Sequence, residues 1–457
     1  MNSLIILAAL GLIILFSEIF NFKKIIFPIV FAGIIAAIVA ALGDWNNSAS
    51  YFNNMIRTDN YAVSFSVLIL FITLLWFVMS SSMFEDQETR TDYFSLIVFS
   101  LIGALVMVSF TNLIMLFLGI EILSISMYAL AGSKKDNLAS NEAAMKYFLL
   151  GAFTTGFLLF GIALVYGITG SFNTDQISEY IMSTGHSSSP VLIAGILLIL
   201  TALTFKIAAA PFHFWAPDVY QGAPTPVTAF MSSVVKTAAI ASFLRLFGSA
   251  FAGPSEFWIA TLWVISAITI VLGNILAVYQ TNLKRMLAYS SISHAGYMIM
   301  SVIALNEKAA SSLLFYTAAY GISSLAAFMV LLIVSSKSGT EEISGLRGMF
   351  SKNPIMASAA CIAVLSLAGI PPLAGFFAKY YIFSAALQSG YTGLVLIAVA
   401  GSLVGVFYYF RIIINIFESN VQMNDLGVNV FNKAFLLICS LLALLFGILP
   451  GLIIDAI

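Results

Sequence analysis

The stretch TFKIAAAPFHFWAPDVYQGAPTPVTAF, Thr204–Phe230, places a lysine and then a proline inside an apolar segment. A charge at the centre of a bilayer costs roughly 2.5–3.5 kcal/mol by insertion scales. Proline has no amide hydrogen, so Pro211 removes the helical hydrogen bond to the carbonyl of Ile207. We therefore expect a helix to break about one turn after Lys206. Such a break persists in a membrane only where it lines a protein-enclosed or hydrated cavity.

The composition indicates a membrane protein. Of 457 residues, 61% are hydrophobic and 9% are charged, which excludes an ordinary soluble core. The apolar runs are about 20 residues long without the alternation of barrel strands, so the fold class is an all-α polytopic membrane protein. The first apolar run lacks a preceding basic region and a clear cleavage site, which indicates a retained helix. The net charge of −1 gives no indication of nucleic-acid binding.

Hydropathy predicts about 14 transmembrane helices. The fourth and fifth are separated only by Phe110, Thr111 and Asn112, which makes their boundary the least marked. The predicted spans are 2–20, 25–43, 61–84, 93–110, 111–132, 146–169, 190–215, 226–247, 257–279, 286–305, 309–335, 355–388, 391–417 and 431–455.

The loops differ strongly in basic charge. Thirteen Lys and Arg residues follow odd-numbered spans, and three, Arg57, Arg245 and Lys308, lie on the opposite side. The positive-inside rule therefore predicts that the odd loops face the cytoplasm and that both termini face outward. The thirteen are Lys23, Lys24, Arg90, Lys134, Lys135, Lys146, Lys284, Arg285, Lys337, Arg347, Lys352, Arg411 and Lys433.

A second interrupted span supports an internal repeat. The segment LSLAGIPPLAGFFAKYYIF, residues 365–383, carries Pro371 and Pro372 ahead of Lys379. Paired broken helices are typical of inverted-repeat transporters. The two breaks fall in the seventh and twelfth spans, so we expect two inverted five-helix repeats each with a broken helix. The predicted units are an N-terminal group (1–92), a first repeat (93–250), a second repeat (256–418) and a C-terminal helix (430–457).

Five titratable residues inside these spans are the candidate functional residues: Glu121, Lys206, Lys236, Lys379 and His294. A buried lysine whose acidic partner can move away is a switchable proton site. Histidine adds a group whose ordinary pKa lies near neutrality, although a single histidine is as often a hydrogen-bonded core residue. The alternatives are a structural Glu–Lys pair, or lysine side chains that reach the membrane surface.

Neither a metal site nor a cofactor site is expected in this chain. The carboxylates are not clustered as Ca²⁺ or Na⁺ sites require, and no nucleotide-binding glycine motif occurs. Cys361 and Cys439 lie singly inside apolar runs, as core residues do.

These segments, together with NLKRMLAYSSISHAGYMIM (282–300) and GLRGMF (345–350), resemble the antiporter-like membrane subunits of respiratory complex I, the NADH:quinone oxidoreductase. The loop PDVYQGAP is similar to that of the subunit N branch. The resemblance covers about residues 60 to 420. It implies that Glu121 and Lys206 are the coupled pair of a first half-channel, Lys236 a central relay, and Lys379 the lysine of a second half-channel. His294 is then expected on the hydrated axis that joins the halves.

The resemblance implies a proton-translocating subunit in a bacterial inner membrane. Quinone reduction is then expected to separate Glu121 from Lys206 and to release a proton toward Lys236 and Lys379. FMN, iron–sulfur clusters and quinone are expected in partner subunits, both membrane and peripheral. One alternative is a subunit of a multisubunit cation/proton antiporter. Na⁺-dependent transport without NADH would favour this alternative. The other is a scaffold in which the buried charges only brace helices.

Overall fold

The computed structural model describes the whole chain except residues 21–24, 82–89, 185–188, 253–254, 420–424 and 457. In these described residues the fold is helical apart from one short antiparallel hairpin, β1 (Ala49–Tyr51) with β2 (Ile56–Thr58). The N-terminal helices are α1 (Asn2–Ile19), α2 (Ile26–Leu42) and α3 (Asn60–Met79).

The next group comprises α4 (Arg90–Ser109), α5 (Leu113–Ala131), α6 (Leu138–Thr169), α7 (Thr174–Thr184), α8 (Pro190–Lys206), α9 (Trp215–Gly222), α10 (Thr225–Phe230), the π-helix η4 (Met231–Val235) and α11 (Lys236–Ser249). The remainder comprises α12 (Ser255–Val278), α13 (Leu283–Ala304), α14 (Ala309–Ser338), the 3-10 helix η5 (Ile343–Leu346), α15 (Met349–Lys352), α16 (Pro354–Ala368), α17 (Ala374–Gln388), α18 (Thr392–Ile416), α19 (Val430–Ile448) and α20 (Gly451–Ile454).

Every predicted span contains a helix or a pair of half-helices. Ten of the described helices are long and apolar enough to cross a membrane, and α2, α8 and α16 are apolar but shorter. Helix α13 is too polar for this criterion, yet its residues from Ser290 to Ala304 are all buried among other helices. The helical membrane fold is confirmed, whereas the number of crossings stays a prediction. The end of the third predicted span lies outside the described residues, as do Lys23 and Lys24.

The short connection between the fourth and fifth spans is confirmed. Helix α4 ends at Ser109 and α5 begins at Leu113. Asn112 caps α5, because its side-chain oxygen accepts a hydrogen bond from the amide of Ile114 at 2.9 Å. A helix can therefore end and the next begin within three residues when the capping side chain is present.

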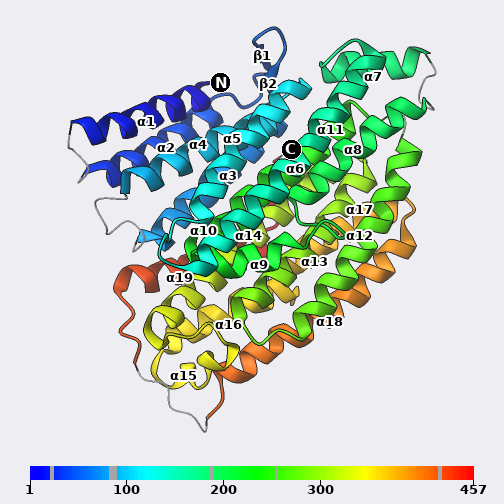
Figure 1. Ribbon diagram of the computed structural model, residues 1–457. Helices are drawn as coiled ribbons and strands as arrows, with labels where there is room; N and C mark the ends of the chain where they lie inside the picture. Colours follow the sequence, from blue (N-terminus) through cyan, green and yellow to red (C-terminus); the bar gives the residue numbers. More distant parts are fainter. Residues whose placement is uncertain (21–24, 82–89, 185–188, 253–254, 420–424, 457) are drawn as a thin grey trace.

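The helices form a slab of roughly parallel rods with two differently built ends (Figure 1). The β1–β2 hairpin and α7, which follow the second and sixth spans, lie at one end, and α15 lies at the other. The second and sixth loops thus lie at one end, called here the even-loop end, and the loop after the eleventh span lies at the other, the odd-loop end. Helix α7 was not predicted, because an 11-residue amphipathic helix is too short and too polar to register as a span.

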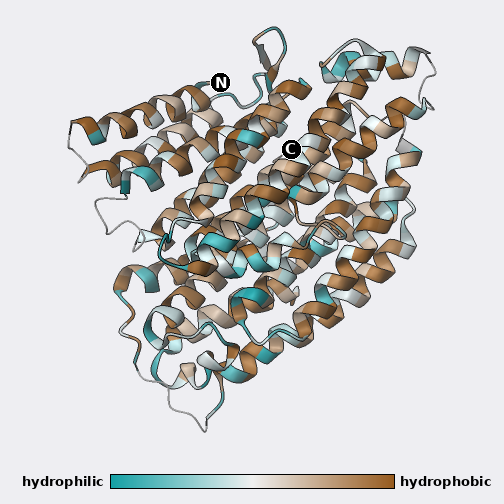
Figure 2. Ribbon diagram, viewed as in Figure 1, coloured by the Kyte–Doolittle hydropathy of each residue, from teal (hydrophilic) through white to brown (hydrophobic). Residues whose placement is uncertain are grey.

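Burial separates inner from outer helices. Every residue from Thr225 to Leu244 is buried, as is nearly all of α14 up to Val334, whereas about one third of α1, α6 and α19 is buried. The outer helices expose large apolar side chains such as Phe153, Leu396 and Leu403, as expected where lipid is the solvent (Figure 2). The charged candidates Lys206, Lys236 and Lys379 therefore lie inside the protein, between helices.

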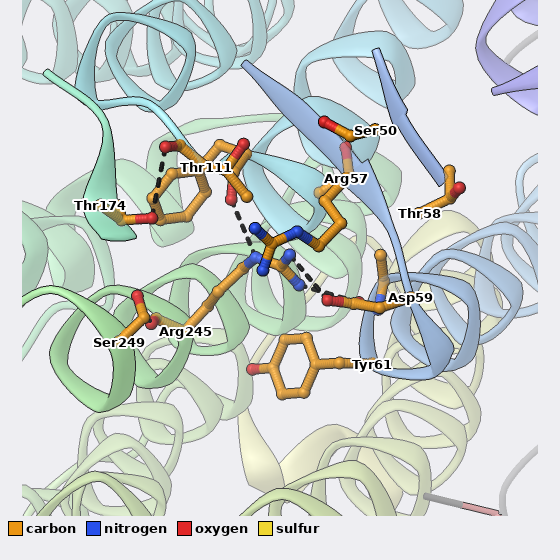
Figure 3. Close-up of polar contacts among 12 residues, drawn as sticks. Ser50, Arg57, Thr58, Asp59, Tyr61, Thr111, Thr174, Arg245 and Ser249 are labelled. Carbon is orange, nitrogen blue, oxygen red and sulfur yellow. Dashed lines mark hydrogen bonds and ion pairs between the residues drawn. The ribbon is translucent and has the colours of Figure 1, made fainter. Parts of the chain in front are cut away.

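A charged cluster fixes the even-loop end of α11 (Figure 3). The Arg245 guanidinium donates two hydrogen bonds to the Asp59 carboxylate, at 2.9 and 3.0 Å, and a third to the carbonyl of Phe110 at 2.8 Å. Asp59 also caps α3 at the amide of Ala62, and the Tyr61 hydroxyl donates to the carbonyl of Ala241 at 2.7 Å. These bonds join α3, α11 and the α4–α5 connection into one rigid group.

Candidate functional site

The first break lies between α8 and α9. Ala208 has a φ of +59°, and the amides of Ala208 and Ala209 donate to the carbonyls of Phe205 and Thr204. This is the Schellman pattern that ends a helix, here with alanine in the left-handed position where glycine is usual. The expectation that the helix continues for a turn past Lys206 is wrong, since Lys206 is its last residue. The left-handed residue ends the helix before the proline acts.

The second break, between α16 and α17, closes in the same way. Gly369 has a φ of +85°, and the amides of Gly369 and Ile370 donate to the carbonyls of Ser366 and Leu365. In each break a proline, Pro211 or Pro372, follows three residues after the left-handed residue. The two interruptions are thus the same local structure built twice.

Both breaks place a lysine at the C-terminal end of the first half-helix. Lys206 is the last residue of α8, while Lys379 lies on α17 and reaches back, so that its Nζ donates to the carbonyl of Ala368, the last residue of α16, at 2.6 Å. The negative end of a helix dipole favours a cation there. The lysine precedes one break and follows the other, yet both are placed against an equivalent helix end.

Lys206 is 7% exposed and contacts α5. Its Nζ donates to the hydroxyls of Ser124 at 2.7 Å and Tyr128 at 3.3 Å, and lies 5.7 Å from the centre of the Tyr128 ring. Glu121, Ser124 and Tyr128 follow one face of α5, at spacings of three and four residues. The surroundings of Lys206 therefore combine one carboxylate, two hydroxyls and one ammonium group.

Glu121 and Lys206 are not in direct contact in this structure. Among the ion pairs of the described residues, none joins them; instead Glu121 accepts a hydrogen bond from the Thr155 hydroxyl of α6 at 2.7 Å. Glu121 is only partly buried, because it lies near the outer surface of the helix layer. Lys206 instead contacts Ser124, one turn further along α5 from Glu121, and the Ser124 hydroxyl contacts the carbonyl of Ile120 rather than the Glu121 carboxylate.

Lys236 lies within the buried run Thr225–Leu244 and is 2% exposed. Its Nζ donates to the carbonyl of Ser291 at 2.6 Å and also contacts the Ser291 hydroxyl. The Tyr220 and Tyr320 side chains lie near the same serine. The π-helix η4 ends directly before Lys236, and such wide turns are frequent at functional sites.

His294 is 4% exposed, and both of its ring nitrogens contact tyrosine hydroxyls. Nδ1 lies 2.6 Å from the Tyr316 hydroxyl on α14, and Nε2 lies 3.3 Å from the Tyr409 hydroxyl on α18. Tyr409 also contacts the Ser290 hydroxyl, one residue from Ser291. The surroundings of Lys236 and His294 are thus joined through α13 and Tyr409.

Lys379 is 7% exposed and completes the row. Besides the carbonyl of Ala368, its Nζ contacts the Ser402 hydroxyl of α18 at 2.9 Å and lies 5.5 Å from the centre of the Tyr297 ring. A cavity of about 10 Å³ beside His294 extends to Ser366 and Ala378 at the second break. This volume is about what one water molecule requires, so a single water could bridge the two regions.

An aromatic series, rather than a hydrogen-bonded chain, connects Lys206 with Lys236. Tyr128 packs on Tyr147 at 4.7 Å, Tyr147 stacks on Trp215 at 4.6 Å, and Trp215 contacts Tyr220 at 6.2 Å between ring centres. Of the four rings, Tyr128 touches Lys206 and Tyr220 lies near Ser291, the partner of Lys236. Proton movement along this section requires water between the rings.

The odd-loop end of the site is fixed by Asp218 on α9, a segment that the sequence suggested was a loop. Its carboxylate pairs with Lys146 of α6 and Arg285 of α13, each at 2.8 Å. Partial burial raises the pKa of Asp218, but the hydrogen bonds and charges of these two cations outweigh it and hold the pKa below its usual value. Asp218 therefore stays ionised and joins the two halves.

The structure brings Lys236, His294 and Lys379 into one connected region, and Glu121 with Lys206 into a second. Sequence reasoning missed the hydroxyls of Tyr128, Tyr220, Tyr316 and Tyr409. The signal was available, because a tyrosine in the interior of an apolar span must find a hydrogen-bonding partner. No group of three or more His, Cys, Asp or Glu residues able to hold a metal occurs in the described part of the chain.

Residues 110–405 match the family described as NADH:quinone oxidoreductase/Mrp antiporter, TM. The chain is 43% identical to NADH-quinone oxidoreductase subunit N of Cytophaga hutchinsonii, over all of this chain and 99% of that one. It is 40% identical to subunit N of Flavobacterium johnsoniae, with the same coverage.

Solved structures show the same fold. The chain superposes on a chain of respiratory complex I from Thermus thermophilus with a TM-score of 0.85, 32% identity, and 99% and 98% of the two chains covered. A chain of the Mrp complex from a Dietzia species superposes with a TM-score of 0.88 but 20% identity, covering 99% and 95%. The fold is therefore common to both kinds of complex, whereas the sequence is nearer to the complex I subunit.

Proposed function

Because the chain belongs to the NADH:quinone oxidoreductase/Mrp antiporter family, we propose that it is the proton-translocating subunit N of a bacterial complex I. The observation that carries the proposal is the row of buried lysines at two equally built helix breaks. Each ammonium group contacts only neutral oxygens, and within the described residues Lys206, Lys236 and Lys379 form no ion pair. A buried lysine held in this way can lose its proton without leaving a carboxylate unpaired.

Glu121, Lys206, Lys236, His294 and Lys379 are the proton-transferring residues of the proposal. Glu121 lies one turn of α5 from Ser124, the contact of Lys206, so its charge acts on Lys206 across space, and the Lys206 proton moves past the aromatic series to Lys236. From there Ser291, Ser290, Tyr409 and His294 lead toward Lys379. A conformational change of the assembled complex that moves Glu121 away from Lys206 removes the favourable charge and drives the transfer.

The repeat boundaries follow from the two breaks. The proposed units are residues 1–92, 93–250, 256–418 and 430–457, with α8–α9 and α16–α17 as corresponding broken helices. Their identical closing hydrogen bonds and the equivalent lysine positions support this division.

The excess of basic residues on the odd loops supports an orientation in the plasma membrane with both termini outward. Redox chemistry belongs to partner subunits, which carry FMN and iron–sulfur clusters and bind quinone. The chain itself is proposed to hold neither a cofactor nor a metal.

The test uses the assembled complex in membrane vesicles, where NADH-dependent quinone reduction and proton uptake are measured together. Lys236→Ala is expected to lower the number of protons moved per electron pair while the complex still assembles. Unchanged proton movement would refute the assignment. Co-purification with membrane subunits alone, with Na⁺-dependent transport and no NADH oxidation, would instead establish the cation/proton antiporter that the Mrp-like fold allows.

A further inference from the structure

A water-accessible vestibule opens at the odd-loop end of the chain, away from the row of lysines. It has a volume of about 540 Å³ and is lined by residues of α4, the α5–α6 loop, the start of α10 and the end of α14, with Glu341 in its wall. The other lining residues include Lys134, Thr225, Ser335 and Ser336. A mixed polar lining of this size holds many waters.

Behind the vestibule lies Lys284, a buried lysine that the function proposed above does not use. It is 3% exposed, and its Nζ contacts the carbonyls of Ala223 at 2.6 Å and Gln221 at 3.1 Å and the Glu341 carboxylate at 3.5 Å. Two of these partners are backbone carbonyls, which do not titrate. Glu341 is therefore the one partner through which a proton from the vestibule can change the state of Lys284.

Lys284 also borders the surroundings of Lys236. It lies on α13 seven residues before Ser291, two helical turns or roughly 10 Å away. The carbonyl that it contacts, that of Gln221, belongs to the residue after Tyr220, whose side chain lies near Ser291. Ser291 in turn contacts the Lys236 ammonium. Tyr220 thus spans the interval between the two lysines.

We propose that the Glu341–Lys284 pair is the proton-uptake site that supplies Lys236. The proposal deepens, and rests on, the function proposed above. When the Lys236 amine is unprotonated, the Ser291 hydroxyl gives it a proton and regains one from the Tyr220 hydroxyl. Lys284 replaces the Tyr220 proton by way of bridging water, and is reprotonated from vestibule water hydrogen-bonded to Glu341. Each carrier ends with the protons it began with, and one proton has moved from the vestibule to Lys236.

The decisive comparison is Glu341→Gln against Glu142→Gln in the assembled complex in inverted membrane vesicles. Glutamine keeps the oxygen that faces Lys284, so the local packing is retained, but it lacks the negative charge that holds the proton-donating water beside Lys284. Glu142 is an exposed carboxylate at the same end, paired with Lys146 and outside the vestibule lining. The expected result is fewer protons per electron pair for Glu341→Gln and no change for Glu142→Gln.

The outcomes separate this site from the function on which it rests. We call the number of protons moved per electron pair the proton ratio. If Lys236→Ala lowers the proton ratio and Glu341→Gln does not, the uptake site is wrong and the proposed function stands. If neither variant lowers it, both are wrong. If Glu341→Gln and Glu142→Gln lower it equally, the effect is one of surface charge and the uptake site is again rejected.

A second measurement does not depend on Glu341. Ser336→Cys places an exposed thiol in the vestibule, and Ser351→Cys places an exposed thiol at the same end outside it. A membrane-impermeant, positively charged thiol reagent is expected to lower proton movement in the first variant and not in the second. Equal responses would overturn the proposal. The native Cys361 and Cys439 are both buried, which keeps background labelling low.

Discussion

At the scale of single residues, the two helix breaks differ in the residue that occupies the left-handed position. Ala208 holds a φ of +59°, where a Cβ atom is disfavoured by roughly 1–2 kcal/mol, whereas Gly369 holds +85° without this penalty. Gly369 has a further constraint, because a Cβ built there would lie 2.9 Å from Cδ and 3.1 Å from Nζ of Lys379. The glycine is thus required both by the backbone and by the lysine beside it.

Gly369→Ala is expected to lower thermal stability by about 1–2 kcal/mol through the left-handed strain and also to displace the Lys379 ammonium. Its proton ratio should fall together with its stability. Ala208→Gly is the matched change at the other break and is expected to stabilise, since it relieves the same strain. Thermal unfolding of the detergent-solubilised complex and vesicle assays check both. A Gly369→Ala variant with unchanged proton movement would contradict the close packing of Lys379.

The Tyr409 hydroxyl contacts both the Ser290 hydroxyl and the His294 ring. Tyr409→Phe keeps the ring and removes both contacts, so it is expected to cost about 1–2 kcal/mol of stability and to slow proton movement. Tyr61→Phe serves as control, because it removes a hydroxyl hydrogen bond of 2.7 Å, to the carbonyl of Ala241, outside the row. Both variants should lose similar stability, while only Tyr409→Phe lowers the proton ratio. Equal proton ratios in the two variants would show that the Tyr409 hydroxyl is structural.

Residue by residue, the sequence predicted the charged members of the site and missed their neutral partners. Lys206, Lys236, Lys379 and Glu121 could be identified because a charge in an apolar span is costly and therefore conspicuous. Tyr316, Tyr409 and Ser402 could not, since serine and tyrosine are ordinary in such spans and reveal a role only once the helices are packed. For the same reason, the separation of Glu121 from Lys206 could not be foreseen.

At the scale of elements, hydropathy predicted where the helices lie but not how they end. The early end of α8 depends on the left-handed Ala208, and the π-helix before Lys236 depends on packing within a fully buried segment. Neither leaves a mark in the apolar pattern, because a π-turn and an α-turn have the same composition. Helix α9 was read as a loop, because prolines and a charged residue precede any apolar run there.

The Asp59–Arg245 pair fixes the even-loop end of α11, the helix that begins at Lys236. Arg245 is 9% exposed in its side chain, so Asp59→Asn leaves a nearly buried guanidinium without its counter-charge. The expected loss is about 1.5–3 kcal/mol, the range for a hydrogen bond to a charged group. It is measured as a lower unfolding temperature.

Asp175→Asn provides the matched control at the same end of the molecule. Its ion pair with Arg57 is largely exposed, with both side chains accessible to solvent, so its loss should change stability by at most about 1 kcal/mol. If the two Asn variants unfold at the same temperature, Arg245 is satisfied by Phe110 and Tyr61 alone, and the clamp assigned to Asp59 is incorrect.

At the scale of the whole molecule, the odd-loop end contains the contact that holds the two proposed repeats together. Asp218 comes from the segment just after the first break and pairs with Lys146 on α6 and with Arg285 on α13. Arg285 also donates to the Gln221 side chain at 3.0 Å. The α9 segment is thus held between the halves by one carboxylate, close to the carbonyls that anchor Lys284.

Asp218 makes the stability of this junction dependent on pH. Its pKa is lower in the folded protein than in the unfolded chain, so the unfolded chain binds the proton more tightly and acid favours unfolding. The stabilisation is fully present above the unfolded pKa of about 4 and disappears as the pH falls through the lower folded pKa.

Asp218→Asn should therefore lower the unfolding temperature at neutral pH. In acid its unfolding temperature should approach that of the unmodified protein. Glu142→Asn, which alters the exposed partner of Lys146, is the control and should lower the unfolding temperature at neutral pH much less. If the difference in unfolding temperature between Asp218→Asn and the unmodified protein persisted undiminished below pH 3, Asp218 would act through packing rather than through its charge.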